Sequence, residues 1–236
     1  MNLEIFKAKE TDSTNNWAKR SNKEEGVFRA FTQTNGKGRL QRKWLSYCDK
    51  NLYFSIKLKV NSPQEALHYN FISSLAIAET LNKDYNLKVT VKWPNDLLVN
   101  NKKFSGILSE FIQNKDKGHA IIGIGINCFF DTENTNIADK ATSLHYHIKN
   151  FDKEVFFENV LISFKDFSDF YRKNGFEKIL KAWNRYAQME NRNIITTING
   201  KKQKVKVINL NNDASLKVVN KDGKLLTLFA GDIEYA

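Results

Sequence analysis

Apolar and polar residues alternate over several short segments of the first 130 residues, which predicts β-strands because successive strand side chains point to opposite faces. Strands are predicted at about 3–9, 27–33, 51–60, 89–93, 96–99 and 102–111. The segment 120–126 is almost continuously apolar, which indicates a central strand buried on both faces. Asn100 and Asn101 tolerate positive φ, so the strands on either side of them are expected to form a hairpin.

Apolar residues recur at the helical period in four other segments. Helices are predicted at about 14–21, 63–83, 152–172 and 176–187, and the polar stretch 131–142 is expected to be a loop. In the second helix Leu67, Phe71 and Leu75 share one face. Pro63 suits the first turn of that helix, where its missing N–H costs no hydrogen bond.

From about residue 190 the pattern changes to short alternating runs separated by turn-forming pairs, including Asn199-Gly200 and Asp222-Gly223. Such spacing is typical of a small all-β barrel or sandwich whose strands are joined by hairpins. We therefore predict a domain boundary at this point, with one domain at 1–189 and a second at 190–236.

The composition, 41% hydrophobic and 12% aromatic over 236 residues, is globular and provides for a sizeable core. No apolar run approaches the length that crosses a bilayer, and the N-terminus lacks a signal-peptide core. Cys48 and Cys128 form no motif, so both are interpreted as structural and the expected location is cytoplasmic. The net charge of +11 favours a polyanionic partner, but the lysines are scattered among asparagines, so charge alone is a weak argument.

The stretch 33–44 alternates Gly36 and Gly38 with Lys37 and Arg39 and contains no acidic residue. Glycine lets a ligand approach the backbone, and the interleaved cations attract negative charge. The stretch therefore indicates an anion site suited to phosphate, although an isolated stretch of this kind is more often a mobile, solvated basic loop. It is neither a P-loop nor a Rossmann fingerprint, because the required glycine spacing is absent.

Three further stretches carry recognisable chemistry. They are Asp12-Ser-Thr-Asn15, Lys92-Trp-Pro-Asn-Asp96 with the following Lys102-Lys-Phe-Ser-Gly-Ile-Leu108, and Gly123-Ile-Gly-Ile-Asn127. Together with the glycine-rich basic stretch, and in the same order from about residue 8 to 144, they resemble the biotin–protein ligase family in its form without an N-terminal DNA-binding domain. The Lys-Trp-Pro-Asn-Asp and Lys-x-x-Gly-Ile-Leu motifs are the specific part of this resemblance.

The resemblance implies an α+β fold. A mixed, largely antiparallel sheet with helices on one face, similar to class II aminoacyl-tRNA synthetases, would form the catalytic domain at 1–189, and a small SH3-like β barrel would follow at 190–236. It also implies that ATP, with Mg²⁺, activates biotin as biotinyl-5′-AMP. The acyl group would then pass to a lysine of a biotin carboxyl carrier protein or domain of a biotin-dependent carboxylase. A homodimer is possible, because an exposed sheet edge can pair across a two-fold axis.

Residues that match the family's motifs are expected to form the site. Lys103 and Arg39 are the predicted catalytic cations, because they would stabilise the charge that builds as a carboxylate meets a phosphate. The predicted contacts to biotin or biotinyl-AMP are Ser13, Thr14, Asn15, Gln33, Gly36, Lys37, Gly38, Arg39, Lys103, Gly106 and Asn127. Short hydroxyl and amide side chains complement the ureido group of biotin, and Asn127 matches the residue that binds adenine.

The sequence departs from the family pattern at two positions. Lys37 stands where the family has an arginine, which keeps the charge but loses bidentate geometry. Ala141 stands where the family often has a tryptophan beside adenine, so either another side chain stacks on the base or the stacking is weaker. No protein metal site is predicted. Asn95 and Asp96 either help to hold a nucleotide-bound Mg²⁺ or only hydrogen-bond to backbone groups of the turn. The histidines at 145 and 147 have no third ligand in their motif.

Two other functions compete with this prediction. The first is a lipoate– or octanoate–protein ligase of the same superfamily, whose Arg-Arg-x-Ser-Gly-Gly-Gly loop is absent here. The second is a basic nucleic-acid-binding regulator, since some biotin ligases also act as repressors through an N-terminal winged helix. The motif that begins at Asp12 leaves no room before it for such a domain, so we expect no specific DNA binding and no membrane partner.

Overall fold

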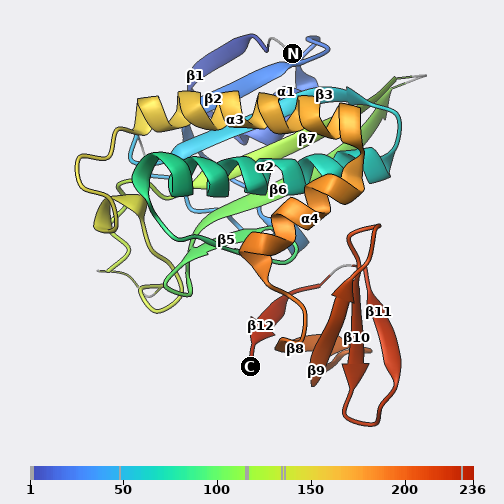
Figure 1. Cartoon of the computed structure of the whole chain (residues 1–236). Coiled ribbons are helices and arrows are strands. Elements are labelled where there is room, and N and C mark those ends of the chain that lie inside the picture. The colour runs from blue at the N-terminus through green and yellow to red at the C-terminus, as the bar shows by residue number, and fades with distance from the viewer. Residues whose placement is uncertain (1–2, 48, 115–116, 134, 136, 230) are drawn as a thin grey trace.

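The computed structural model of the chain describes residues 3–47, 49–114, 117–133, 135, 137–229 and 231–236 (Figure 1). None of the described helices combines the length and the apolar character that crossing a membrane requires. Cys48 lies outside the described residues, whereas Cys128 is a free, buried thiol. Burial raises the pKa of Cys128 to about 12, which agrees with its interpretation as structural because a protonated thiol is unreactive.

Seven strands form the main sheet in the order β1-β2-β3-β7-β6-β5-β4. They are β1 (Ile5–Thr11), β2 (Gly26–Gln33), β3 (Leu52–Val60), β4 (Thr90–Lys92), β5 (Asp96–Val99), β6 (Lys102–Asn114) and β7 (Lys117–Ile126). The β1–β2 pair is parallel, and the other neighbours pair in antiparallel fashion. The predicted α+β class and the mixed, largely antiparallel sheet are therefore confirmed.

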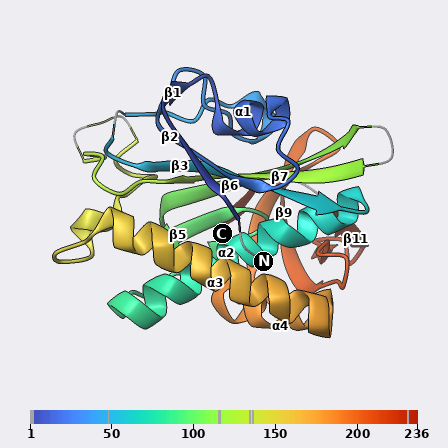
Figure 2. The same ribbon diagram turned by 90° about the horizontal axis from the view of Figure 1, so that it is seen from above.

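Three long helices cover one face of this sheet: α2 (Pro63–Tyr85), α3 (Lys153–Asn174) and α4 (Phe176–Ala187). Figure 2 shows that the short helix α1 (Thr14–Arg20) lies on the opposite face. There Ala18 packs with Phe28 and Ile121 in a small cluster separate from the main core. The prediction that all helices share one face is thus wrong for α1, because its apolar residues meet the outward-facing side chains of β2 and β7.

Strand β7 presents different residues to the two faces. Ile122, Ile124 and Ile126 belong to the main core under the long helices. Gly123 and Gly125 alternate with them and point to the α1 face, where added Cβ atoms would meet Asn15 and Trp44. Because successive strand residues point to opposite faces, the isoleucines of β7 face the main core and the glycines face α1. On the α1 face the strand backbone therefore carries no side chains at these two glycines.

The segment 131–142 forms turns over its described residues and runs beside the start of β6. Lys103 N donates to Lys140 O at 2.9 Å, and Thr142 N donates to Lys103 O at 2.9 Å. Two 3₁₀ helices, η1 (Arg39–Gln41) and η2 (Leu144–Tyr146), were not predicted, because a single turn is too short to show a period.

A second sheet contains the C-terminal strands in the order β11-β10-β9-β8-β12. The strands are β8 (Asn193–Ile198), β9 (Lys201–Leu210), β10 (Leu216–Asn220), β11 (Leu225–Leu228) and β12 (Ile233–Tyr235). The order is open over the described residues, so the predicted SH3-like barrel is not confirmed. Val207 and Leu216 join the main core, and Trp93 Nε1 donates to Ala214 O at 2.9 Å, so this sheet packs directly on the first. The predicted boundary at residue 190 stays a prediction.

Candidate active site

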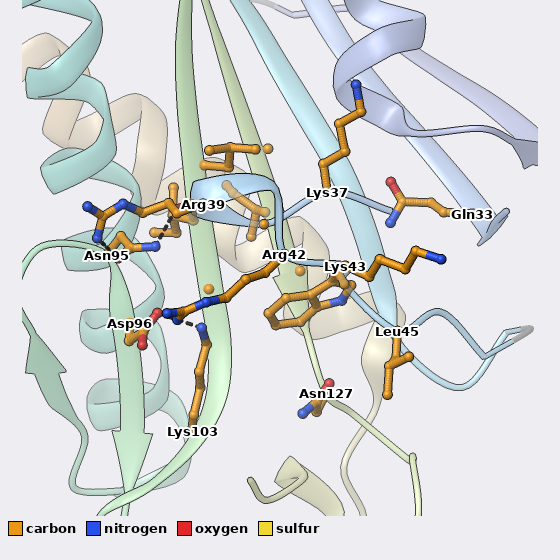
Figure 3. A pocket seen from close by; sticks show the side chains of 18 of the residues that line it. Gln33, Lys37, Arg39, Arg42, Lys43, Leu45, Asn95, Asp96, Lys103 and Asn127 are labelled. Carbon is orange, nitrogen blue, oxygen red and sulfur yellow. Dashed lines mark hydrogen bonds and ion pairs between the residues drawn. The ribbon is translucent and has the colours of Figure 1, made fainter. Parts of the chain in front are cut away.

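A cavity of about 300 Å³ opens on the α1 face of the main sheet. Its lining brings together distant stretches of the sequence: the start of α1, the basic loop (residues 36–43), β6, β7 and Asp232, which directly precedes β12 (Figure 3). The predicted site residues that line it are Ser13, Thr14, Asn15, Gln33, Lys37, Gly38, Arg39, Lys103, Gly106 and Asn127. Gly36 lies behind the cavity wall, where its carbonyl accepts from Trp44 N at 2.9 Å.

One end of the cavity is lined by the neutral polar side chains of Thr14, Asn15 and Gln33. Ser55 does not line the cavity but hydrogen-bonds to two of them, and we call these four residues the neutral end. Gln33 Oε1 accepts from Thr14 N at 2.9 Å and from Thr14 Oγ1 at 3.2 Å. Ser55 Oγ lies 2.8 Å from Thr14 Oγ1 and 2.6 Å from Asn15 Oδ1. Thr14, Asn15 and Ser55 are buried, so this end is held rigid by its own hydrogen bonds. Sequence reasoning missed Ser55, whose alternating strand carries no motif.

The position of Asn15 depends on β6 and β7. Asn15 Nδ2 donates to Glu110 Oε2 at 2.7 Å and to Leu108 O at 3.3 Å. Lys19 Nζ lies 2.6 Å from Glu110 Oε1, which neutralises this carboxylate. A Cβ on Gly123 would overlap Asn15 Oδ1, so only glycine leaves room for the amide. The helix α1 is therefore fixed against the sheet by polar contacts as well as apolar ones.

The basic loop folds back on itself along the cavity, where its Arg39 and the neighbouring Lys103 form what we call the cationic end. Gly38 N donates to Arg42 O at 2.7 Å, and η1 forms the tip. Leu40 at this tip has a φ of 52° and is exposed, which is an unfavourable conformation for a residue with a Cβ. Lys37 Nζ donates to Asn16 Oδ1 at 3.2 Å, so the loop contacts α1 on one side.

The two predicted catalytic cations lie beside the turn that follows β4 (Figure 3). Arg39 donates to Asn95 Oδ1 at 3.1 Å, and Lys103 Nζ lies 2.6 Å from Asp96 Oδ1. Asn95 in turn donates to Ile107 O at 2.8 Å, which fixes its orientation. Asn95 and Asp96 were left out of the predicted catalytic set, yet the structure makes them the partners of both cations.

Trp44 covers the glycine floor of the cavity (Gly106, Gly123 and Gly125). Added Cβ atoms on Gly106 and Gly125 would lie 2.9 Å and 2.5 Å from its indole ring, so neither position has room for a side chain. Its ring centroid lies 5.4 Å from Lys103 Nζ, within cation–π range. The buried indole nitrogen has no hydrogen-bond partner over the part of the chain that is described. Sequence reasoning gave Trp44 no role, although its place directly after the basic loop was a usable signal.

Asn127 lies at the end of β7 and connects the cavity with the segment after it. Asn127 N donates to Phe104 O at 2.8 Å, and its side-chain amide donates to Thr142 O at 3.2 Å. Ala141 lines the same part of the cavity, as expected from its position in the sequence. Tyr47 and Phe130 also line the cavity and stack on each other with ring centroids 3.9 Å apart.

Among the described residues no group of three or more His, Cys, Asp or Glu side chains is placed to hold a metal ion. His145 Nδ1 lies 3.0 Å from Cys128 O, and His147 Nε2 lies 2.8 Å from Thr142 Oγ1. Burial, followed by the charges of His145 and Lys102, lowers the pKa of His147. These histidines therefore have a structural role and stabilise the segment that follows β7.

The fold and the cavity define an α+β protein with a site between a glycine floor and a basic loop, whose lining suits a small, partly anionic molecule. Residues 6–127 match the model of the Biotin/lipoate A/B protein ligase family. This match covers more than half of the chain, which therefore belongs to that family, and the resemblance to biotin–protein ligases is confirmed.

Similar proteins come from several bacteria. The Bacillus spizizenii "Bifunctional ligase/repressor BirA" is 28% identical over 215 residues, which are 87% of this chain and 64% of that protein. The Escherichia coli protein of the same name is 28% identical over 172 residues, 72% of this chain and 54% of that protein. The chain thus spans less than two thirds of these relatives. A solved structure, "Biotin protein ligase from Aquifex aeolicus in complex with biotin and ATP", is 27% identical with a TM-score of 0.83, and 99% of each chain is covered.

Proposed function

We propose that the protein is an ATP-dependent ligase that activates biotin as biotinyl-5′-AMP and transfers the biotinyl group to a lysine of a carrier protein or domain. The observation that carries this proposal is that one cavity joins a buried neutral end to a cationic end. A ligand with an uncharged polar head, an apolar middle and a phosphate fits that order. Family membership and the named ligands of the Aquifex structure support the same assignment.

The neutral end suits the ureido ring of biotin. A ureido group offers one C=O acceptor and two N–H donors, and hydroxyl and amide side chains such as those of Thr14 and Gln33 supply both kinds of partner. A charged head group would instead be left without a counter-ion, because Glu110 below Asn15 is already paired with Lys19. This end therefore favours biotin over ligands that lack such a ring, including lipoate and octanoate.

The cationic end suits the first chemical step. A carboxylate oxygen of biotin attacks the α-phosphorus of ATP, an O–P bond forms, and the bond to pyrophosphate breaks. Both reactants are anionic, so Lys103 and Arg39 lower the barrier by offsetting the repulsion and stabilising the charge of the transition state. In the second step a neutral lysine amine of the carrier attacks the acyl carbon, AMP leaves, and the amine proton passes to solvent.

The nucleotide is expected to extend toward the end of β7. Asn127 and Ala141 line the cavity, and the stacked rings of Tyr47 and Phe130 in the same lining offer an aromatic surface for a purine site that lacks the family's tryptophan. Stacking on such a ring contributes about 0.5–1.5 kcal/mol to the binding free energy, in addition to the contribution of the apolar area that is buried. Mg²⁺ would arrive on the phosphates, where it would neutralise charge, and Asp96 in the cavity lining is a carboxylate that could help to hold it.

The test is ATP–pyrophosphate exchange with biotin, lipoate and octanoate offered separately to the purified protein. We expect exchange with biotin and at most slow exchange with the other two acids. Equal or faster exchange with lipoate or octanoate would instead make the protein a lipoate– or octanoate–protein ligase. The predicted homodimer is checked by light scattering with and without biotin and ATP, because a ligand that binds one oligomer better shifts its population.

A further inference from the structure

The C-terminal sheet reaches the basic loop at one point, just before β12 begins. Arg39 donates to Gly231 O at 3.1 Å, and the carboxylate of Asp232 lies 3.8 Å from the same guanidinium. Arg42 pairs with the other carboxylate oxygen of Asp232 at 2.5 Å. Two arginines of one loop are thus held by adjacent residues that lie about 190 positions further along the chain.

The arrangement of carboxylates around the cavity leaves Asp232 as the partner of the loop arginines. Two carboxylates line the cavity over the described residues, Asp96 and Asp232. Asp96 already pairs with Lys103, so Asp232 is the carboxylate that faces the arginines of the loop. The backbone of Asp232 is itself fixed, because its carbonyl accepts from the buried Thr196 Oγ1 of β8 at 3.0 Å.

We propose that Asp232 is a positioning residue that holds the basic loop in place over the cavity. The loop needs an external partner, because it carries four cations, has a strained exposed tip and makes few hydrogen bonds of its own. The carboxylate offsets the repulsion between the arginines and fixes their distance from the cavity. The consequence for catalysis rests on the function proposed above, whereas the attachment of the loop does not.

The contact is weak enough to open. The side chains of Arg42 and Asp232 are 69% and 42% exposed, and exposed pairs of this kind contribute little and are screened by salt. A loop held in this way can release a product and close again, which a deeply buried ion pair would prevent. The ion pairs of Asp232 therefore connect the C-terminal sheet to the loop reversibly.

The test uses hydrogen–deuterium exchange of a peptide covering residues 34–47 in the full chain without ligand. We expect Asp232→Asn to raise exchange in this peptide about two- to fivefold, the size of effect an exposed ion pair produces. The matched control is Glu234→Gln, which removes an equal charge two residues away that pairs with Lys202 instead. Equal exchange in the two variants would overturn the proposal.

A double-mutant cycle separates a direct contact from a general charge effect. Asp232→Asn and Arg42→Gln should each raise exchange, and the double variant should raise it no further, because both remove the same pair. Asp232→Glu should recover part of the protection. Additive effects would mean that Asp232 acts only by its distant field and not by positioning the loop. No recovery with glutamate would mean that a carboxylate at this position does not protect the loop, and this result would also overturn the proposal.

A further measurement addresses catalysis. With biotin and ATP bound, Asp232→Asn should raise the escape of the adenylate to water by the factor found for loop exchange, since both need the loop to open. Raised loop exchange without raised escape would separate the loop contact from catalysis and overturn this part. If no adenylate forms even in the unchanged protein, the proposed function fails while the exchange result on the unliganded loop still decides the role of Asp232.

Discussion

The two ends of the cavity differ in how they are built. At the neutral end Thr14, Asn15 and Ser55 are buried and bonded to one another, so their geometry exists before any ligand arrives. At the cationic end Arg39, Lys103 and the rest of the basic loop are partly exposed and depend on separate elements of the fold. The contrast indicates that one end selects the ligand by preformed shape and the other adapts to the charge that the reaction creates.

The largest effect is expected at Lys103 of the cationic end. Lys103→Ala should lower the rate of biotin-dependent pyrophosphate exchange about 10²–10³-fold, the usual cost of losing one preorganised charge stabiliser. Lys102→Ala is the control, because Lys102 does not line the cavity. Unfolding free energy should change by no more than about 1 kcal/mol, since the Lys103–Asp96 pair is partly exposed. Equal losses in both variants would reduce Lys103 to one part of a general field.

The next effect tests retention of the intermediate. Arg39→Ala should raise the release or hydrolysis of biotinyl-AMP about 10–100-fold, because hydrogen bonds to a charged group contribute about 1.5–3 kcal/mol. Quenched-flow assays of labelled intermediate measure this directly. The control is Arg185→Ala on α4, which removes an equal charge away from the cavity. If the intermediate is retained equally well in both variants, Arg39 does not contact it.

A substitution that disturbs the neutral end should change the affinity for biotin and not the rate of the chemical step. Gly123→Ala would push its methyl group into Asn15 Oδ1, and crowding a packed site costs about 1–3 kcal/mol. We therefore expect biotin affinity, measured by calorimetry, to fall about fivefold or more. The rate of exchange at saturating biotin should change little, because the cations are not displaced. Unchanged affinity in a folded variant would show that biotin does not use this end.

The smallest effect concerns the loop itself. Trypsin should cut within residues 34–43 several times more slowly when biotin and ATP are present, because the bound phosphate adds partners for Lys37, Arg39 and Arg42. Sites outside the cavity, such as those on α4, report any general change in protease activity. Equally fast cleavage of the loop with and without ligand would remove its role as a lid.

Sequence patterns predicted the strands of the main sheet and all four helices because hydrophobic periods are local. The motifs also located ten residues that line one cavity. The roles of Asn95 and Asp232 were not predictable in this way, since each depends on Arg39, which lies far from both in the chain. Trp44 could have been suspected from its place directly after the basic loop, but its contacts with glycines of two other strands could not be predicted from the sequence.

The fold of the C-terminal strands shows a second limit. Turn-forming pairs such as Asn199-Gly200 and Asp222-Gly223 indicate hairpins, and the hairpins are present. Whether edge strands close into a barrel depends on twist and on what covers them, which alternation does not encode. The face occupied by α1 was likewise mispredicted, because a seven-residue helix carries too few apolar positions to define its partner.

The alternation of isoleucine and glycine along β7 has a consequence for how the protein can change over evolutionary time. A one-residue insertion before Ile122 would exchange the two faces of the strand. Glycines would then leave voids under α2, and isoleucines would fill the space now taken by Asn15 and Trp44. Insertions of this kind in the strand should therefore be purged.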